Sequence, residues 1–147
     1  MKTVAKELAY VSLLLAGIVI FSYAQSSTTP VIGVGGPTAK SIVLLAPTTG
    51  QTNYAQLSYP SQAKITRVSC ATDAGTVTIN FDIRSESTPN TAGSNVLSSA
   101  LVCGTSSAFT TSIQNSLVLP NAPVNLQISA VSGTPNVLRI HVNANPQ

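Results

Sequence analysis

The chain has 147 residues, of which 44% are hydrophobic and only 7% are charged. A soluble domain has about 25% charged residues on average, so a domain formed by this chain must cover its surface largely with Ser, Thr, Asn and Gln. The formal charge is +3. The basic residues are scattered, without the cluster and interleaved aromatic residues of a nucleic-acid-binding surface. The sequence therefore predicts a single domain with no nucleic-acid partner.

Residues 1–24 have the layout of a secretory signal peptide. Two lysines precede an apolar run, and Ser22-Tyr23-Ala24 places small residues at the two positions that a signal peptidase reads. As a helix, the apolar run to Ala24 would rise about 25 Å, which is short of the roughly 30 Å hydrocarbon core of a bilayer. We expect this N-terminal hydrophobic helix to be cleaved after Ala24 on export. A retained membrane anchor is the alternative.

Residues 25–39 are rich in Ser, Thr, Gly and Pro and have no helical period, which predicts a flexible arm. The glycines at 33, 35 and 36 do not form a phosphate loop, because no Gly-Lys-Ser/Thr follows them. Alternatively, Val31, Ile32 and Val34 form an assembly arm that adds a strand to the sheet of a neighbouring subunit. Residues 40–147 are then the folded domain.

The longest alternating run, at residues 75–84, predicts a strand with one face in the core. Val77, Ile79, Phe81 and Ile83 would face inward, and the even positions would face water. Similar runs predict about eight strands with a spacing of roughly ten residues, which is typical of an all-β antiparallel sandwich, either jelly-roll or immunoglobulin-like. The run at 41–46 is expected to be buried on both sides. The predicted strands are 41–46, 54–59, 64–70, 75–84, 95–103, 108–113, 124–131 and 137–142.

The last two predicted strands have the pattern of a β-hairpin. Gly133 could adopt a positive φ in the turn 132–136, and Pro135 cannot take part in a central ladder. Ala130 is expected to face the core together with the apolar residues before it. His141 is expected on the outward face of the last strand.

The chain has two cysteines, Cys70 and Cys103, each at the end of a predicted strand. An exported protein experiences an oxidising environment, so the pair predicts a disulfide, with two buried reduced thiols as the alternative. Two cysteines and one histidine lack the paired spacing of a zinc site. We therefore expect no metal and no other cofactor.

No motif predicts a catalytic site. Asp82 and Glu86 would lie about 13 Å apart along a strand, beyond the roughly 5 to 9.5 Å between the carboxyl groups of glycosidases. Both are expected to be solvated, with Asp82 and Arg84 in exposed ion pairs that contribute little. A triad of a serine, His141 and Asp73 stays open, although no nucleophile motif supports it.

Several segments, in their order along the chain, resemble small β-sandwich modules of phage structural proteins and related environmental surface proteins. These segments are KSIVLLAP at 40–47, ITRV at 65–68, GTVTINFDIR at 75–84, AGSNVL at 92–97 and ISAVSGTP at 128–135. The resemblance covers about residue 40 to the C-terminus. It implies a non-enzymatic virion or surface module.

The sequence as a whole predicts an exported, non-enzymatic structural or adhesive subunit of an extracellular assembly, such as a filament, a pilus-like fibre or a surface coat. Its partner would be further copies of itself, in a homo-oligomer or polymer, because a surface with few charges does little to prevent association at sheet edges. Membrane contact is expected only if the leader is retained. The alternative function is a virion structural protein, in a capsid, spike or decoration, anchored through the N-terminal helix. An enzyme that uses His141 is a further alternative.

Overall fold

The computed structural model describes residues 31–33, 39–50 and 52–147. All regular elements in this part of the chain are strands: β1 (Val31–Gly33), β2 (Ala39–Leu45), β3 (Thr52–Leu57), β4 (Ala63–Thr72), β5 (Thr76–Ile83), β6 (Ser94–Asn95), β7 (Leu101–Cys103), β8 (Ala108–Thr110), β9 (Leu117–Val118), β10 (Val124–Ser132) and β11 (Val137–Pro146). No helix in these residues could cross a membrane. The predicted leader, residues 25–30 of the predicted arm and Val34 lie outside the described residues.

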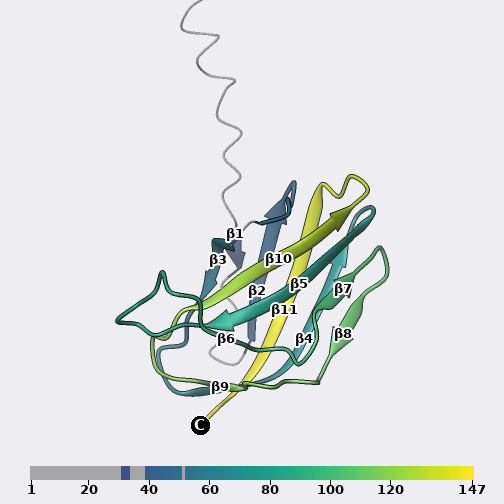
Figure 1. Ribbon diagram of the computed structural model, residues 1–147. Helices are drawn as coiled ribbons and strands as arrows, with labels where there is room; N and C mark the ends of the chain where they lie inside the picture. Colours follow the sequence, from purple (N-terminus) through teal and green to yellow (C-terminus); the bar gives the residue numbers. More distant parts are fainter. Residues whose placement is uncertain (1–30, 34–38, 51) are drawn as a thin grey trace, which may run out of the picture.

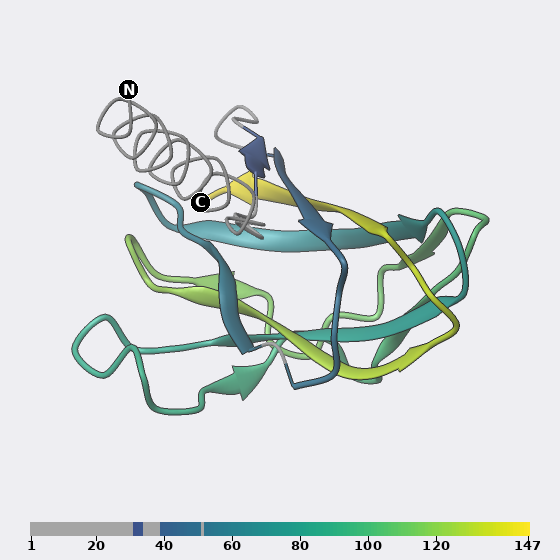
Figure 2. The ribbon, with the colours of Figure 1, turned by 90° about the horizontal axis from the view of Figure 1, so that it is seen from above.

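The strands form two antiparallel sheets, which Figure 2 shows as two layers, one above the other. The first sheet has the order β1-β2-β11-β4-β8, and β9 also pairs with β4. The second sheet has the order β3-β10-β5-β6, and β7 also pairs with β5. Figure 1 shows the long strands β4, β5, β10 and β11 in the middle of the molecule. The predicted all-β antiparallel sandwich is therefore confirmed.

Alternation along the long strands builds the core between the sheets. In β5, Val77, Ile79 and Phe81 are buried as predicted, and in β11 alternate residues are buried as predicted. Ile83, at the end of β5, is only partly buried. The largest fully buried side chains come from both sheets and from the segments that join them: Tyr59, Phe81, Ile42, Leu44, Leu57, Ile65, Ile79, Leu97, Leu126, Leu138, Ile140 and Val68.

The predicted hairpin between the last two strands is wrong. β10 pairs with β3 and β5 in the second sheet, whereas β11 pairs with β2 and β4 in the first. The link 133–136 therefore crosses from one layer to the other. Two strands that face each other across a core have the same apolar alternation as two strands of a hairpin, so the pattern could not distinguish them.

Burial differs from the prediction at two further places. Ala130 is exposed, because the register of β10 against β5 shifts between Ile128 and Ala130 and such a bulge reverses the face of the residues that follow. The run at 41–46 is not buried on both sides: Leu45 is 44% exposed, and Ala46 leaves the strand with a φ of 46°. β2 covers the core with one face only.

The segment from residue 94 to residue 118 contains several short strands. The predicted strand 95–103 is divided into β6 and β7, with Leu97 in an isolated bridge to Ile113. The predicted strand 108–113 ends at Thr110, and β9 was not predicted. These pieces pair only along the margins of β4 and β5, where two or three ladder positions are too few to produce a clear alternation.

The disulfide predicted between Cys70 and Cys103 is present and joins β4 of the first sheet to β7 of the second, with the two Cα atoms 5.4 Å apart. Both cysteines are buried. The loop that the disulfide closes has a sequence separation of 33 residues, so in the chain-entropy picture it stabilises the fold by about 4 kcal/mol. The bond holds the two layers together near one margin.

Two links between the layers touch each other at glycines. Gly75 lies between β4 and β5, and Gly133 follows β10, with φ values of 60° and 76°. A Cβ at Gly75 would collide with the carbonyl oxygen of Ser132, and a Cβ at Gly133 would meet the Cα of Gly75 at 3.0 Å. Glycine is required here both for the backbone conformation and for the close approach.

Candidate functional site

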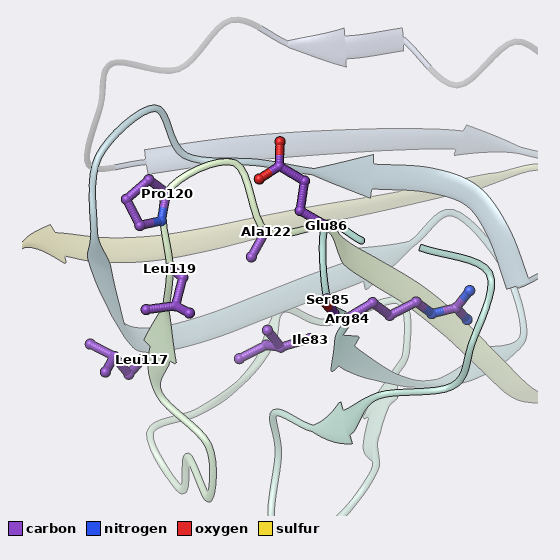
Figure 3. Close-up of a pocket in the computed structure, with 8 residues that line it drawn as sticks. All are labelled: Ile83, Arg84, Ser85, Glu86, Leu117, Leu119, Pro120 and Ala122. Atoms are coloured by element: carbon purple, nitrogen blue, oxygen red, sulfur yellow. The ribbon is translucent and has the colours of Figure 1, made fainter. Parts of the chain in front are cut away.

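A pocket of about 400 Å³ lies where the end of β5 approaches the segment from β9 to β10. Figure 3 shows the apolar side chain of Ile83 on the same side of the pocket as Leu117 and Leu119, whereas the guanidinium group of Arg84 points away from the two leucines. Leu117 is 48% exposed and Leu119 is 59% exposed. The lining residues are Ile83, Arg84, Ser85, Glu86, Leu117, Leu119, Pro120 and Ala122. The pocket offers mainly an apolar surface, with a carboxylate at Glu86.

Arg84 forms a buried ion pair beside this pocket, which corrects the predicted exposed pair. The Nε atom of Arg84 donates to Oδ2 of Asp82 at 2.7 Å, and the backbone N–H of Gly93 donates to the same oxygen at 3.0 Å. Asp82 is completely buried and Arg84 is 7% exposed. Their side chains lie on the outer side of the second sheet, where the loop 85–93 covers them. Nη1 of Arg84 donates to the carbonyl oxygen of Pro89 in this loop at 3.0 Å.

The predicted solvated pair of Asp82 and Glu86 is wrong for Asp82. Glu86 is exposed at the pocket, while Asp82 lies beneath the loop 85–93, bound to Arg84. The Oδ1 atom of Asp82 is buried with no hydrogen-bond partner among the described residues. The two carboxylates therefore belong to different environments, one in water and one in a structural network. Sequence alternation could not reveal this, because it does not show which outward positions a loop covers.

A row of polar residues crosses the outer face of the second sheet at the level of Asp82. Asn125 is paired with both Gln56 and Asp82, and Asp82 is paired with Asn95. A hollow of about 290 Å³ next to this row is lined by Gln56, Pro89, Asn90 and Asn125. Amide groups can donate and accept hydrogen bonds, so this hollow suits a small neutral polar group. No prediction from the sequence pointed to it.

His141 lies on the exposed outer face of the first sheet, as predicted. Its Nδ1 atom is 2.7 Å from Oγ of Ser41, which occupies the opposite position on β2. Asp73 is elsewhere: its carboxylate accepts hydrogen bonds at 2.9 Å from the backbone N–H groups of Asn136 and Val137. Val137 and His141 are four residues apart on one strand, which is about 13 Å. The structure therefore forms a serine–histidine pair without the aspartate of the possible triad.

Hydrogen bonding lowers the pKa of Asp73 below its usual value, chiefly because the backbone N–H of Val137 stabilises the carboxylate; a smaller desolvation effect acts in the opposite direction. The role of Asp73 is to fix the link between β10 and β11, where its carboxylate satisfies two backbone donors. This carboxylate is therefore structural, and it is exposed to solvent.

Tyr59 is almost completely buried, and desolvation raises its pKa to about 12. Its hydroxyl group has no hydrogen-bond partner among the described residues, and the Nζ atom of Lys40 lies 5.7 Å from the centre of its ring. A tyrosine in this position packs in the core and is not available to stack against a ligand.

No group of three or more His, Cys, Asp or Glu side chains within residues 39–50 and 52–147 is arranged to hold a metal ion. Of the predicted assembly-arm residues, Val31 and Ile32 lie in β1, which pairs with β2 of the same chain, and Val34 is outside the described residues. The structure therefore brings together Cys70 with Cys103, Asp82 with Arg84, and His141 with Ser41.

No protein-family model matches this chain, and no curated protein matches it. Among solved structures, the chain is similar to the N-terminal cellulose-binding domain of β-1,4-glucanase C from Cellulomonas fimi, with 12% sequence identity and a TM-score of 0.43. The match covers 75% of this chain and 79% of that domain. A similarity of this size carries no argument about what the present chain binds.

Proposed function

We propose that this chain is an exported, non-enzymatic structural or adhesive subunit that self-associates by exchanging the edge strand β1. The observation that carries the proposal is the ladder between β1 and β2, in which Val31 is paired with Val43, Ile32 with Ile42 and Gly33 with Ser41. Such a ladder requires only an extended segment, so β1 of a neighbouring copy can make the same pairs.

The position of β1 in the sheet favours exchange. β1 is the outermost strand of the first sheet, and without it the edge of β2 would present unpaired backbone groups. The first sheet also has one face in the core and one face outside, so a strand added at this edge does not disturb the core. An edge of this kind supports addition of a strand from another copy.

The distribution of reactive groups supports a role other than catalysis. His141 is bonded to Ser41 on an open sheet face, Asp73 is bound to backbone at the end of the same strand, and Asp82 is paired with Arg84. Catalysis by acid and base groups requires these groups to converge on one site from which water can be excluded. These groups lie in separate places.

Deletion of residues 31–33 tests the exchange of β1. We expect the mature protein to form oligomers or polymers in sedimentation and light-scattering experiments, and the variant without residues 31–33 to be a monomer. Deletion of residues 26–28 is the matched control, since it shortens the chain equally and keeps β1. A mature protein that stays monomeric at all concentrations, or a deletion of 31–33 that leaves the assembly unchanged, would refute the proposal.

The intact mass of the native protein, with and without reductant, tests export. Loss of residues 1–24 together with a two-dalton increase on reduction, for the Cys70–Cys103 bond, is the expected result. Retention of residues 1–24 would instead favour a virion structural protein that is held in a membrane by its N-terminal segment.

A further inference from the structure

The outer face of the first sheet carries a line of basic side chains. Arg139 and His141 lie on β11, Arg67 is opposite Asn143, and Lys64 is opposite Asn145. These four side chains are exposed. They therefore occupy four successive outward levels of β11, at residues 139, 141, 143 and 145. Two residues of a strand rise about 7 Å, so the line is about 20 Å long with one basic group at each level.

Among the described residues, no aspartate or glutamate side chain forms an ion pair with Arg139, Arg67 or Lys64. Asp82 is buried in the second sheet, and Glu86 lies at the pocket beside β5. Asp73 lies beyond the Arg139 end of the line, with its carboxylate bound to the backbone of Asn136 and Val137. The face therefore has a local positive potential that the small net charge of the chain does not reveal.

The other residues on this part of the outer face, level with His141, are polar, apart from one aromatic ring. His141 is paired with Ser41 on β2 and with Ser69 on β4, and Ser69 is in turn paired with Phe109 on β8. Asn143 occupies the next outward position on β11. Phe109 is 60% exposed, and the guanidinium carbon of Arg67 lies 4.2 Å from the centre of its ring. This cation–π contact holds Arg67 against the sheet with its charge at the surface.

From this arrangement we propose that the outer face of the first sheet binds an acidic polysaccharide, with the chain running along β11. Carboxylate or sulfate groups on sugars along the chain would pair with Arg139, Arg67 and Lys64. The hydroxyl and amide groups of Ser41, Ser69 and Asn143 would bind sugar hydroxyls. A linear, hydroxylated polyanion fits a flat, charged strip of this length. The binding face is a different surface from the β1 edge, and the inference shares only the extracellular setting with the proposed function.

Two other polyanions fit the face less well. A membrane surface would require a continuous apolar face, whereas the exposed ring of Phe109 on this face is in contact with the guanidinium group of Arg67. A single-stranded nucleic acid would require several exposed aromatic rings for its bases, and this face offers one large ring, Phe109. The buried disulfide also favours an oxidising compartment, in which an extracellular polymer is accessible to the chain.

Binding of polygalacturonate and of dextran sulfate to the mature protein tests the proposal, with neutral dextran as the reference. We expect binding at low salt that disappears near 1 M salt, where the Debye length is about 3 Å. Arg67→Gln and Arg139→Gln should each weaken binding about two- to fivefold, which corresponds to the loss of one exposed ion pair. The triple variant with Lys64→Gln should weaken it about tenfold or more.

Lys40→Gln is the matched control, since it removes the same charge from a residue that lies over the Tyr59 ring and outside the line. Its binding should be unchanged. The proposal is overturned if neither acidic polymer binds at low salt, if Lys40→Gln weakens binding as much as Arg67→Gln does, or if vesicles of phosphatidylglycerol or a thymidine oligonucleotide bind more tightly than both polymers. Monomers in the sedimentation experiment would refute exchange of β1 and leave this result intact.

Discussion

The buried ion pair between Asp82 and Arg84 makes the sharpest prediction about stability. Arg84→Met leaves the charge of Asp82 completely buried without its cationic partner, while the N–H of Gly93 still donates to Oδ2. Removing one partner of a buried pair costs about 3 to 5 kcal/mol, whereas an exposed pair contributes only about 0.2 to 1 kcal/mol. We therefore expect Arg84→Met to lower the free energy of unfolding by about 3 kcal/mol or more.

Urea unfolding with linear extrapolation measures this change, and Arg139→Met is the matched control because it removes an exposed arginine from the other sheet. The control should change the free energy by about 0.5 kcal/mol or less. The double variant Asp82→Leu with Arg84→Met should be more stable than Arg84→Met alone, because it no longer buries an unpaired charge. The buried pair would be refuted if Arg84→Met lowers the free energy of unfolding no more than Arg139→Met does. It would also be refuted if the effects of Asp82→Leu and Arg84→Met on this free energy are additive.

Three further predictions concern other parts of the fold. Replacing both cysteines by alanine should lower the free energy of unfolding by about 4 kcal/mol, and reductant should change the urea midpoint of the parent protein but not that of the variant. Gly75→Ala should cost about 2 kcal/mol or more, because of its φ of 60° and the collision with Ser132, while Gly104→Ala, where a Cβ meets nothing within 4 Å, should be nearly neutral in the same assay. Since the folded-state pKa of Tyr59 is raised from 10.0 to about 12, its contribution to stability is complete below pH 10, and about 2 kcal/mol of it is lost by pH 12. Tyr59→Phe should remove this loss, and the same alkaline loss of stability in Tyr59→Phe as in the parent protein would contradict the burial of the hydroxyl.

The parts of the fold that alternation could predict are the ones where one strand covers many ladder positions. β5 pairs along its whole length with β10, and β11 pairs along most of its length with both β2 and β4, so their inward residues had to be apolar at every second position. The disulfide followed from the expected export of the chain and from the position of each cysteine at the end of a predicted strand. In these cases the local pattern and the final packing impose the same requirement on the sequence.

The pairing of strands could not be read in the same way. The pattern of β10 and β11 requires only that their apolar faces meet, and a sandwich meets this requirement across the core as well as a hairpin does within one sheet. Likewise, Asp82 occupies an outward position of β5 and Arg84 follows directly after this strand, and the loop 85–93 buries both. The line from Arg139 to Lys64 also joins two strands that are far apart in sequence. The sequence therefore contains no local cluster of basic residues from which this charged face could be predicted.

The edge strand and the basic face make a joint prediction, because they belong to the same sheet. Exchange of β1 would place several copies of the Arg139-to-Lys64 line in one assembly, and a long polyanion could then contact several copies at once. Linked sites of this kind raise the apparent affinity by a factor of about 10² or more without new contacts. The mature protein should therefore bind long polygalacturonate at least tenfold more tightly than short oligogalacturonate, compared at equal sugar concentration. The variant without residues 31–33 should bind the short form normally and lose most of this preference; an equal preference in both proteins would mean that binding and assembly act independently.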